Sequence, residues 1–217
     1  MNPKRPSPRM NKQSFLKTHT VHLPMRGLRH KRVVVVASEF NGVLSEALTR
    51  SAVQTLLEHG MARRNVQVLW VPGAFELPVM AARVLFAKSR PDALIALGAL
   101  IRGQTAQYRV IAQAVFEGLI RVSVDTLTPV SCGVIVAETQ AQAKARALKQ
   151  PGNRGIEAAV AALRMIGAFE AFGPVRGSKR KKVIARTVLL DPFVRFKARR
   201  AGGIDTGTGF AGKDETA

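Results

Sequence analysis

The feature that most constrains the fold of this chain is a regular alternation of short apolar runs with longer stretches of helical periodicity. Four runs are rich in Val, Ile, Leu and Ala without a strict polar and apolar alternation: Val33–Ala37, Val66–Val71, Ala93–Leu100 and Cys132–Ala137. Such runs are typical of strands in a parallel sheet that are covered on both faces. We therefore expect four buried parallel strands.

Helical patterns follow each of these runs. Apolar residues recur every three or four positions in residues 44–57, 77–86, 108–122, 141–148 and 156–172. Strands that alternate with helices, joined by right-handed crossovers, predict an α/β fold: a three-layer α/β/α sandwich around a flavodoxin-like, four-stranded parallel sheet. Ligands of such sheets bind at the carboxyl ends of the strands. The loops expected there are 38–42, 72–76, 102–107 and 138–140.

The net charge of +20 belongs mainly to the two ends of the chain. Residues 1–32 hold nine Lys or Arg and no acid, and residues 174–200 hold ten against one acid. We therefore divide the chain into a basic extension (1–30), a folded domain (31–172) and a basic, Gly-rich extension (173–217), and expect both extensions to be disordered. Basic tails are either solvated chain or arms that bind nucleic acid or cargo. Residues 1–30 also resemble an organelle transit peptide, although four prolines interrupt any amphipathic helix there.

Composition also excludes several classes of protein. No apolar run approaches the length of a membrane span, and no secretory segment is evident, so we expect no membrane partner. A single cysteine allows no internal disulfide, which favours a reducing compartment and a cytoplasmic location. No spacing of Cys, His and carboxylate residues indicates a metal site, so we expect neither a metal nor another cofactor.

Two of the strand-end loops carry residues suited to a flat polar ligand. In Ser38-Glu39-Phe40-Asn41, Phe40 could stack on a heterocycle while Asn41 offers a donor and an acceptor. The alternative is a core Phe next to a helix-capping Asn. In the segment 71–78 (VPGAFELP), small residues allow close backbone approach, and Glu76 could bind a hydroxyl or complement a helix dipole.

A third loop has the pattern of an anion site. Gly103-Gln104-Thr105 lies between the apolar run 93–100 and a helical stretch, where unpaired N–H groups and the helix dipole favour a phosphate. Arg146 and Arg154 could add charge to the same anion, or could simply be solvated.

In this order, the motifs resemble those of the lumazine synthase family. The matching segments are SEFN at 38–41, VPGAFELP at 71–78, ALGALIRGQT at 96–105, AQAKARA at 141–147 and GNRGIEAA at 152–159. The resemblance implies condensation of 5-amino-6-(D-ribitylamino)uracil with 3,4-dihydroxy-2-butanone 4-phosphate to 6,7-dimethyl-8-ribityllumazine, a transferase step of riboflavin biosynthesis that uses no cofactor. It also implies a homo-oligomer, either a pentamer or a 60-subunit capsid, with active sites shared between neighbouring subunits. Riboflavin synthase is a further partner that the family suggests.

The resemblance further implies roles for individual residues. The uracil ring would stack on Phe40, the ribityl hydroxyls would bind Glu76, and the phosphate would also bind Arg146 of a neighbouring subunit. The family's substrate-binding positions correspond to Phe40, Asn41, Gly73, Ala74, Phe75, Glu76, Leu100, Ile101, Cys132 and Arg154. Its phosphate-binding positions correspond to Gly103, Gln104, Thr105 and Arg146.

Three positions depart from the family pattern. The proton-shuttling His is replaced by Gln107, the acid two residues later by Arg109, and an aromatic of the fourth strand by Cys132. Since Gln107 does not titrate, we expect a slow synthase in which the catalytic position holds and orients groups rather than carrying protons. The alternative is a weakened homologue that binds a lumazine or flavin, or forms a shell, and whose basic tails bind nucleic acid or cargo.

Overall fold

The computed structural model describes residues 27–173. Short loops join each strand to the helix that follows it, as is typical of β–α units. The elements are η1 (Leu28–His30), β1 (Val33–Ser38), α2 (Gly42–Glu58), η2 (Arg63–Asn65), β2 (Val66–Val71), η3 (Ala74–Glu76), α3 (Leu77–Leu85), β3 (Ala93–Ile101), α4 (Gln107–Thr126), β4 (Val130–Ala137), α5 (Gln140–Leu148) and α6 (Arg154–Phe172).

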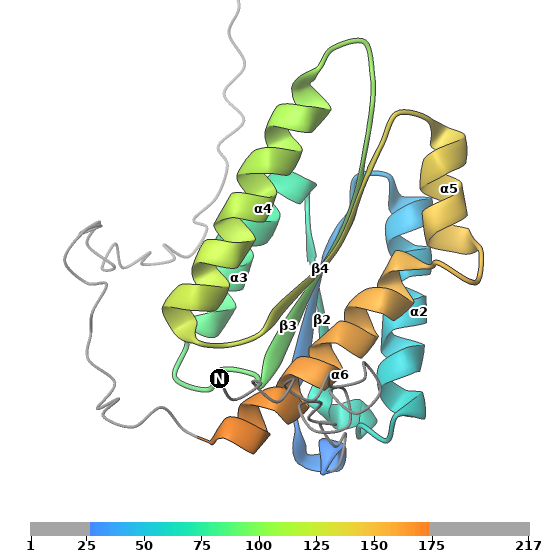
Figure 1. Ribbon diagram of the computed structural model, residues 1–217. Helices are drawn as coiled ribbons and strands as arrows, with labels where there is room; N and C mark the ends of the chain where they lie inside the picture. Colours follow the sequence, from blue (N-terminus) through green and yellow to red (C-terminus); the bar gives the residue numbers. More distant parts are fainter. Residues whose placement is uncertain (1–26, 174–217) are drawn as a thin grey trace, which may run out of the picture. The chain divides into compact units, whose positions relative to one another are not determined.

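The four strands form one parallel sheet in the order β2-β1-β3-β4. Figure 1 shows α3 and α4 on one face of this sheet, and α2, α5 and α6 on the other. The predicted α/β fold, a flavodoxin-like three-layer sandwich, is therefore confirmed. All four strands end at the same edge of the sheet, so the four following loops lie side by side in the order of their strands.

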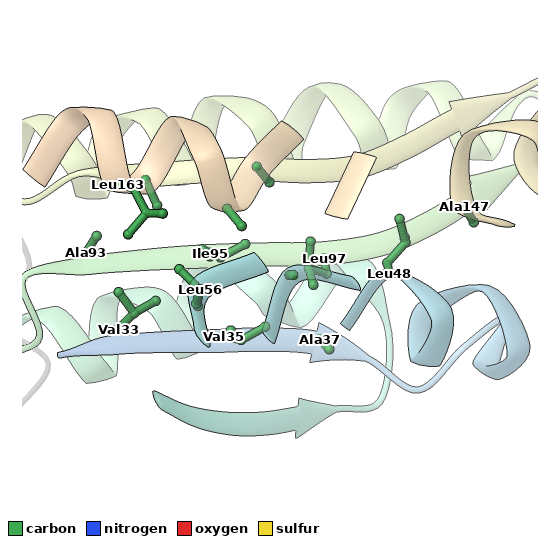
Figure 2. Close-up of a cluster of buried hydrophobic side chains, with 14 of the residues drawn as sticks. Val33, Val35, Ala37, Leu48, Leu56, Ala93, Ile95, Leu97, Ala147 and Leu163 are labelled. Atoms are coloured by element: carbon green, nitrogen blue, oxygen red, sulfur yellow. The ribbon is translucent and has the colours of Figure 1, made fainter. Parts of the chain in front are cut away.

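Two apolar cores, one on each face, hold the layers together. Alternate residues of β1 and β3 point to opposite faces, as the period of a strand requires. On the α2, α5 and α6 face, Leu48, Leu56 and Leu163 pack on Val35 and Ile95, and Figure 2 shows these side chains gathered over one face of the sheet. Because the central strands are buried on both faces, the sheet is a rigid base for the loops at its edge.

The expectation that all four apolar runs are covered on both faces is wrong for residues 66–71. β2 is an outer strand, and Leu69 and Trp70 are 37% and 41% exposed. β2 pairs with β1 on one side only, so its other side and parts of its two faces stay open. The apolar residues of β2 are therefore not all buried within a single chain.

The described part of the chain begins four residues before the predicted start of the domain. Leu28 of η1 is 3% exposed and belongs to the same core as Val33 and Leu56. Residues 1–26 and 174–217 lie outside the described residues, and so do nearly all of the predicted basic extensions. No helix within residues 27–173 is long and apolar enough to cross a membrane.

Candidate active site

Backbone and side-chain hydrogen bonds join the loops at the carboxyl edge of the sheet to their neighbours. The amides of Glu39 and Phe40 donate to the carbonyls of Val71 and Pro72, over 2.7 and 3.1 Å. On the other side, the Arg102 amide donates to the Ala137 carbonyl over 2.9 Å. The loops after β1 and β2, and those after β3 and β4, therefore form two tied pairs along one edge.

Two aromatic rings stand exposed at this edge. Phe40 and Phe75 are 68% and 62% exposed. The interpretation of Phe40 as a core residue is therefore wrong, because the tied loop after β1 holds it outside both cores. An exposed ring at the end of a buried strand can stack on a flat heterocycle.

Asn41 connects the first loop to β3 rather than capping its own helix. It occupies the residue before α2 with φ 60° and makes no side-chain cap, while its Nδ2 donates to the Ala99 carbonyl over 2.8 Å. The capping hydrogen bond expected from the sequence is therefore absent. Pairing between β1 and β3 ends at Leu97. The Asn41 side-chain amide therefore supplies a donor to the β3 backbone beyond that point, just before Leu100 and Ile101.

Glu76 lies immediately before α3 and turns back toward the strand end. A β-carbon placed on Gly73 would lie 3.0 Å from Glu76 Oε2. Within residues 27–173, no hydrogen bond caps α3 through this carboxylate and no ion pair involves it. Glu76 is half-buried and follows the buried Ala74 and the exposed Phe75, so this loop offers both an acceptor and a ring.

Gly103-Gln104-Thr105 lies directly before α4, as expected for a phosphate loop. Residues 102–107 are exposed, and Ala106, the residue before the helix, makes no side-chain cap. The first N–H groups of α4 therefore have no side-chain acceptor from the capping position, and the helix dipole adds its positive end at the same place. This arrangement suits a phosphate dianion.

A cluster next to this loop was not predicted from the sequence. The Glu138 carboxylate accepts hydrogen bonds from the Tyr108 hydroxyl over 2.6 Å, from Arg109 Nη2 over 2.5 Å and from Arg102 Nη1 over 3.3 Å. These hydrogen bonds, that of Tyr108 first and that of Arg109 second, lower the pKa of Glu138 to about 2. Glu138 is therefore a carboxylate near neutral pH and takes up no proton there. The one available signal was Arg109 itself, a cation where the family pattern has an acid.

Three of the predicted site residues lie elsewhere, on the outer edge of β4 and the adjoining helices. Cys132 pairs with Ala96, five residues before the last pair of β3 and β4, which places it about 16 Å from the strand end. Burial raises the pKa of its thiol, while nearby Arg154 acts in the opposite direction. Arg146 Nη2 and Arg154 Nη1 both bind Glu157 Oε2, over 3.0 and 2.8 Å. The structure therefore divides the predicted residues into two groups.

We call these groups the carboxyl-edge half-site and the β4-edge half-site. The β4-edge half-site consists of Cys132, Arg146, Arg154 and Glu157. The carboxyl-edge half-site consists of Phe40, Asn41, Gly73, Ala74, Phe75, Glu76, Leu100, Ile101, Gly103, Gln104, Thr105 and Gln107.

Local structure fixes the start of α6, and with it the β4-edge half-site. Asn153 Oδ1 accepts from the amides of Gly155 and Ile156, which caps the helix. A β-carbon on Gly155 would lie 2.2 Å from the Leu48 carbonyl oxygen, so only glycine lets α6 approach α2 this closely. Arg154 and Glu157 are thereby placed on the first turn of a rigid helix.

The two histidines within residues 27–173 lie at the opposite end of the sheet. His30 precedes the start of β1, and His59 follows the end of α2. Because strands and helices run in opposite directions in β–α units, both positions are at the amino edge of the sheet. Neither imidazole can replace the missing histidine at position 107. No group of three or more His, Cys, Asp or Glu in the same range is placed to hold a metal ion.

Comparison with known proteins identifies the family. The family model for 6,7-dimethyl-8-ribityllumazine synthase matches residues 30–170. A 6,7-dimethyl-8-ribityllumazine synthase of Gemmatimonas aurantiaca is 44% identical over 140 residues, which cover 64% of this chain and 85% of the relative. The proteins of the same name from Porphyromonas gingivalis and Chlorobium limicola are 42% and 40% identical, covering 63% and 65% of this chain and 84% and 90% of the relatives. The chain therefore belongs to the 6,7-dimethyl-8-ribityllumazine synthase family.

Proposed function

We propose that this protein condenses 5-amino-6-(D-ribitylamino)uracil with 3,4-dihydroxy-2-butanone 4-phosphate and releases 6,7-dimethyl-8-ribityllumazine, phosphate and water. The observation that carries this proposal is the carboxyl-edge half-site, in a chain of this family. Along one rigid edge lie an exposed Phe40, the Glu76 carboxylate, which has no hydrogen-bond or ion-pair partner within residues 27–173, and the amino end of α4. They match, in order, a flat ring, a polyhydroxyl chain and a phosphate.

The chemistry asks mainly for orientation and charge stabilisation. The amine of the pyrimidine attacks the ketone to form an imine, phosphate leaves, and the ring closes. Holding two reactive substrates in place can supply about 7–11 kcal/mol of the barrier in favourable cases. N–H groups at the start of α4 also stabilise the departing phosphate, since its charge develops where they point.

Proton transfer is the weak part of this site. Gln107 is the first residue of α4 and can hold a water or a carbonyl but cannot titrate. Glu138, the nearest carboxylate on the next loop, is held ionised by Tyr108 and Arg109. We therefore propose that water or the phosphate of the substrate carries the protons, and that turnover is slow.

We further propose that each complete site contains the carboxyl-edge half-site of one subunit and the β4-edge half-site of its neighbour. Register places Cys132 far from the strand ends, and Arg146 binds Glu157 rather than a residue of the phosphate loop. Two surface hollows lie elsewhere: one between α2 and β2, beside Trp70, and one between α2 and α5. A homo-oligomer in which the β4 edge of one subunit covers the carboxyl edge of the next would close the site. From the family resemblance, we propose that this oligomer is a pentamer or a 60-subunit capsid.

The proposal is tested by incubating the full chain with both substrates and following lumazine absorbance. We expect a rate above that of the spontaneous condensation at equal substrate concentration. Ligand affinity together with a rate equal to the uncatalysed one would instead support the second candidate, a binding or shell-forming homologue. The observation that favours this candidate is the absence of any histidine from the carboxyl edge within residues 27–173.

The remaining partners are proposals from sequence alone. Ten basic residues against one acid in residues 174–200 favour binding to nucleic acid or anionic cargo through counterion release. Co-purification of RNA that is lost with rising salt, and lost on deletion of residues 174–217, would support this binding. Riboflavin synthase, as the consumer of the product, and a cytoplasmic location rest on the family and on the single cysteine respectively.

A further inference from the structure

Glu138 contacts the chain on both sides of the phosphate-binding loop, residues 103–107. Arg102, which donates to Oε2, comes directly before the loop, and Tyr108 and Arg109, which donate to Oε1, come directly after it. Arg109 Nε also donates to the Tyr108 hydroxyl over 2.7 Å, and its guanidinium lies 5.6 Å from the centre of the Tyr108 ring. One carboxylate therefore holds the two ends of the loop together.

The loop has little else to hold it. Residues 103–107 are all exposed. Among residues 27–173, no hydrogen bond of a side chain from 103–107 ties the loop to the rest of the domain. The backbone supplies one bond at each end, from the Arg102 amide to Ala137 and from the Arg109 amide to Ala106. The order of the loop thus depends on its flanks.

Glu138 is itself well fixed. Its amide donates to Gln142 Oε1 over 2.8 Å, and Gln142 is also part of the capping box that Thr139 forms at the start of α5. A capping box satisfies two helix-terminal amides at once and orders the first turn. The carboxylate is therefore presented from the short loop between the end of β4 and the structured start of α5.

We propose that Glu138 is the positioning residue of the phosphate-binding loop, and that Arg109 is the cation through which it acts. This inference rests on the proposed function, since it takes the loop to hold the phosphate of the substrate. N–H groups that already point at the anion lose less freedom when it binds, so the loop binds more tightly when it is ordered beforehand. The acid that the family pattern has at position 109 could not make this bond.

Glu138→Gln separates positioning from simple electrostatics, because the two predict opposite signs. Removing a negative charge beside a phosphate would by itself tighten phosphate binding. Loss of positioning weakens it. In the full-length variant, we expect the KM for the phosphate-bearing ketone to rise about fivefold, which is the size of effect that exposed ion pairs have. The KM for the pyrimidine should stay unchanged. The Kd for inorganic phosphate, measured by ³¹P NMR, should rise by the same factor.

Two further variants keep the test independent of folding defects. Tyr108→Phe removes one donor to Glu138 without changing any charge, and we expect a smaller rise in the phosphate Kd, about twofold. Asp125→Asn is the matched control, since Asp125 pairs with Arg121 on the same helix but at its far end. Hydrogen exchange of the amides in 103–107 should be faster in Glu138→Gln and in Tyr108→Phe and unchanged in Asp125→Asn.

The outcomes distinguish the two proposals. Unchanged or tighter phosphate binding in Glu138→Gln overturns the positioning role, whether or not the enzyme turns over. An equal rise in both KM values also overturns it, because that result describes a general structural defect. If Glu138→Gln does not fold, an unchanged phosphate Kd in Tyr108→Phe overturns it. If the wild-type protein shows no turnover but the phosphate Kd rises as expected, positioning stands and the proposed synthase activity fails.

Discussion

A carboxylate between two arginines lies beside the carboxyl-edge half-site and another lies within the β4-edge half-site, yet the two clusters are built differently. Glu138 binds Arg102 and Arg109, which flank an exposed loop at the strand ends. Glu157 binds Arg146 and Arg154, which lie on α5 and on the capped first turn of α6. The first carboxylate joins the two flanks of an exposed loop, whereas the second balances cations already placed by helices.

From this difference we propose separate tasks for the two regions. The carboxyl-edge half-site offers rings, backbone amides and the Glu76 carboxylate, which recognise shape and hydrogen-bonding pattern. The β4-edge half-site offers two guanidinium groups against one carboxylate, and so a net positive charge. A site made from both would bind the pyrimidine through the first region and would draw the phosphate with help from the second. Each variant below weakens one region and leaves the other intact.

Arg146→Gln should have the largest effect. It removes the phosphate contact that we propose for the β4-edge half-site, and loss of one such charged donor should lower kcat/KM by about 100-fold. Steady-state lumazine formation measures the change. Arg121→Gln, which alters an exposed cation near the far end of α4, is the control and should leave kcat/KM unchanged.

Mixing two inactive variants tests directly whether the half-sites belong to different subunits. Subunits carrying Arg146→Gln and subunits carrying Glu76→Gln each lack one half. After dissociation and random reassembly, about a quarter of head-to-tail contacts join two intact halves, so about a quarter of wild-type activity should return. No recovery from a mixed assembly would show that both halves act within one chain.

Gln107→His should restore part of the missing proton transfer. A well-placed general base contributes about 10²–10⁴-fold, and an imidazole added to an unadapted site should give about tenfold in kcat. The variant should also gain a pH dependence near the ordinary pKa of histidine, which the wild-type protein lacks at this position. A variant with the same rate and the same pH profile would argue against this account of the site.

Phe40→Ala should raise the KM for the pyrimidine about fivefold, because it removes a stacking partner from the carboxyl-edge half-site. The KM for the phosphate-bearing ketone should change little. Phe86→Ala is the matched control: Phe86 is 57% exposed, at the other end of α3 and away from the strand-end loops. Equal effects of the two substitutions would remove Phe40 from the site.

We expect the smallest effect in the stability of the protein at acid pH. Since the pKa of Glu138 is lowered to about 2 in the folded protein, its bonds to Tyr108 and Arg109 stabilise the fold fully above its ordinary pKa near 4.5. That stabilisation is lost as pH falls from 4.5 toward 2. Urea unfolding of wild type and of Glu138→Gln should therefore converge at low pH and differ at neutral pH. A constant difference over this range would contradict the lowered pKa.

Sequence patterns predicted the sheet well because a parallel β–α fold depends on local features that recur. Each run near Val33, Val66, Ala93 and Cys132 became a strand, since β-branched and apolar residues in short stretches suit a buried sheet. The same patterns misjudged Trp70, because apolar composition does not distinguish a strand covered by helices from an outer strand. Which strand lies at the edge depends on strand order, a property of the whole sheet.

Sequence by itself thus determined the fold class and the family, and it predicted which residues form the site. Tertiary structure alone decided how those residues are grouped. Register places Cys132 about 16 Å from the strand ends, and the Glu138 cluster joins residues that are about 30 positions apart in the chain. Local periodicity carries no information on such pairs, because they form only when neighbouring strands of a sheet bring their ends together.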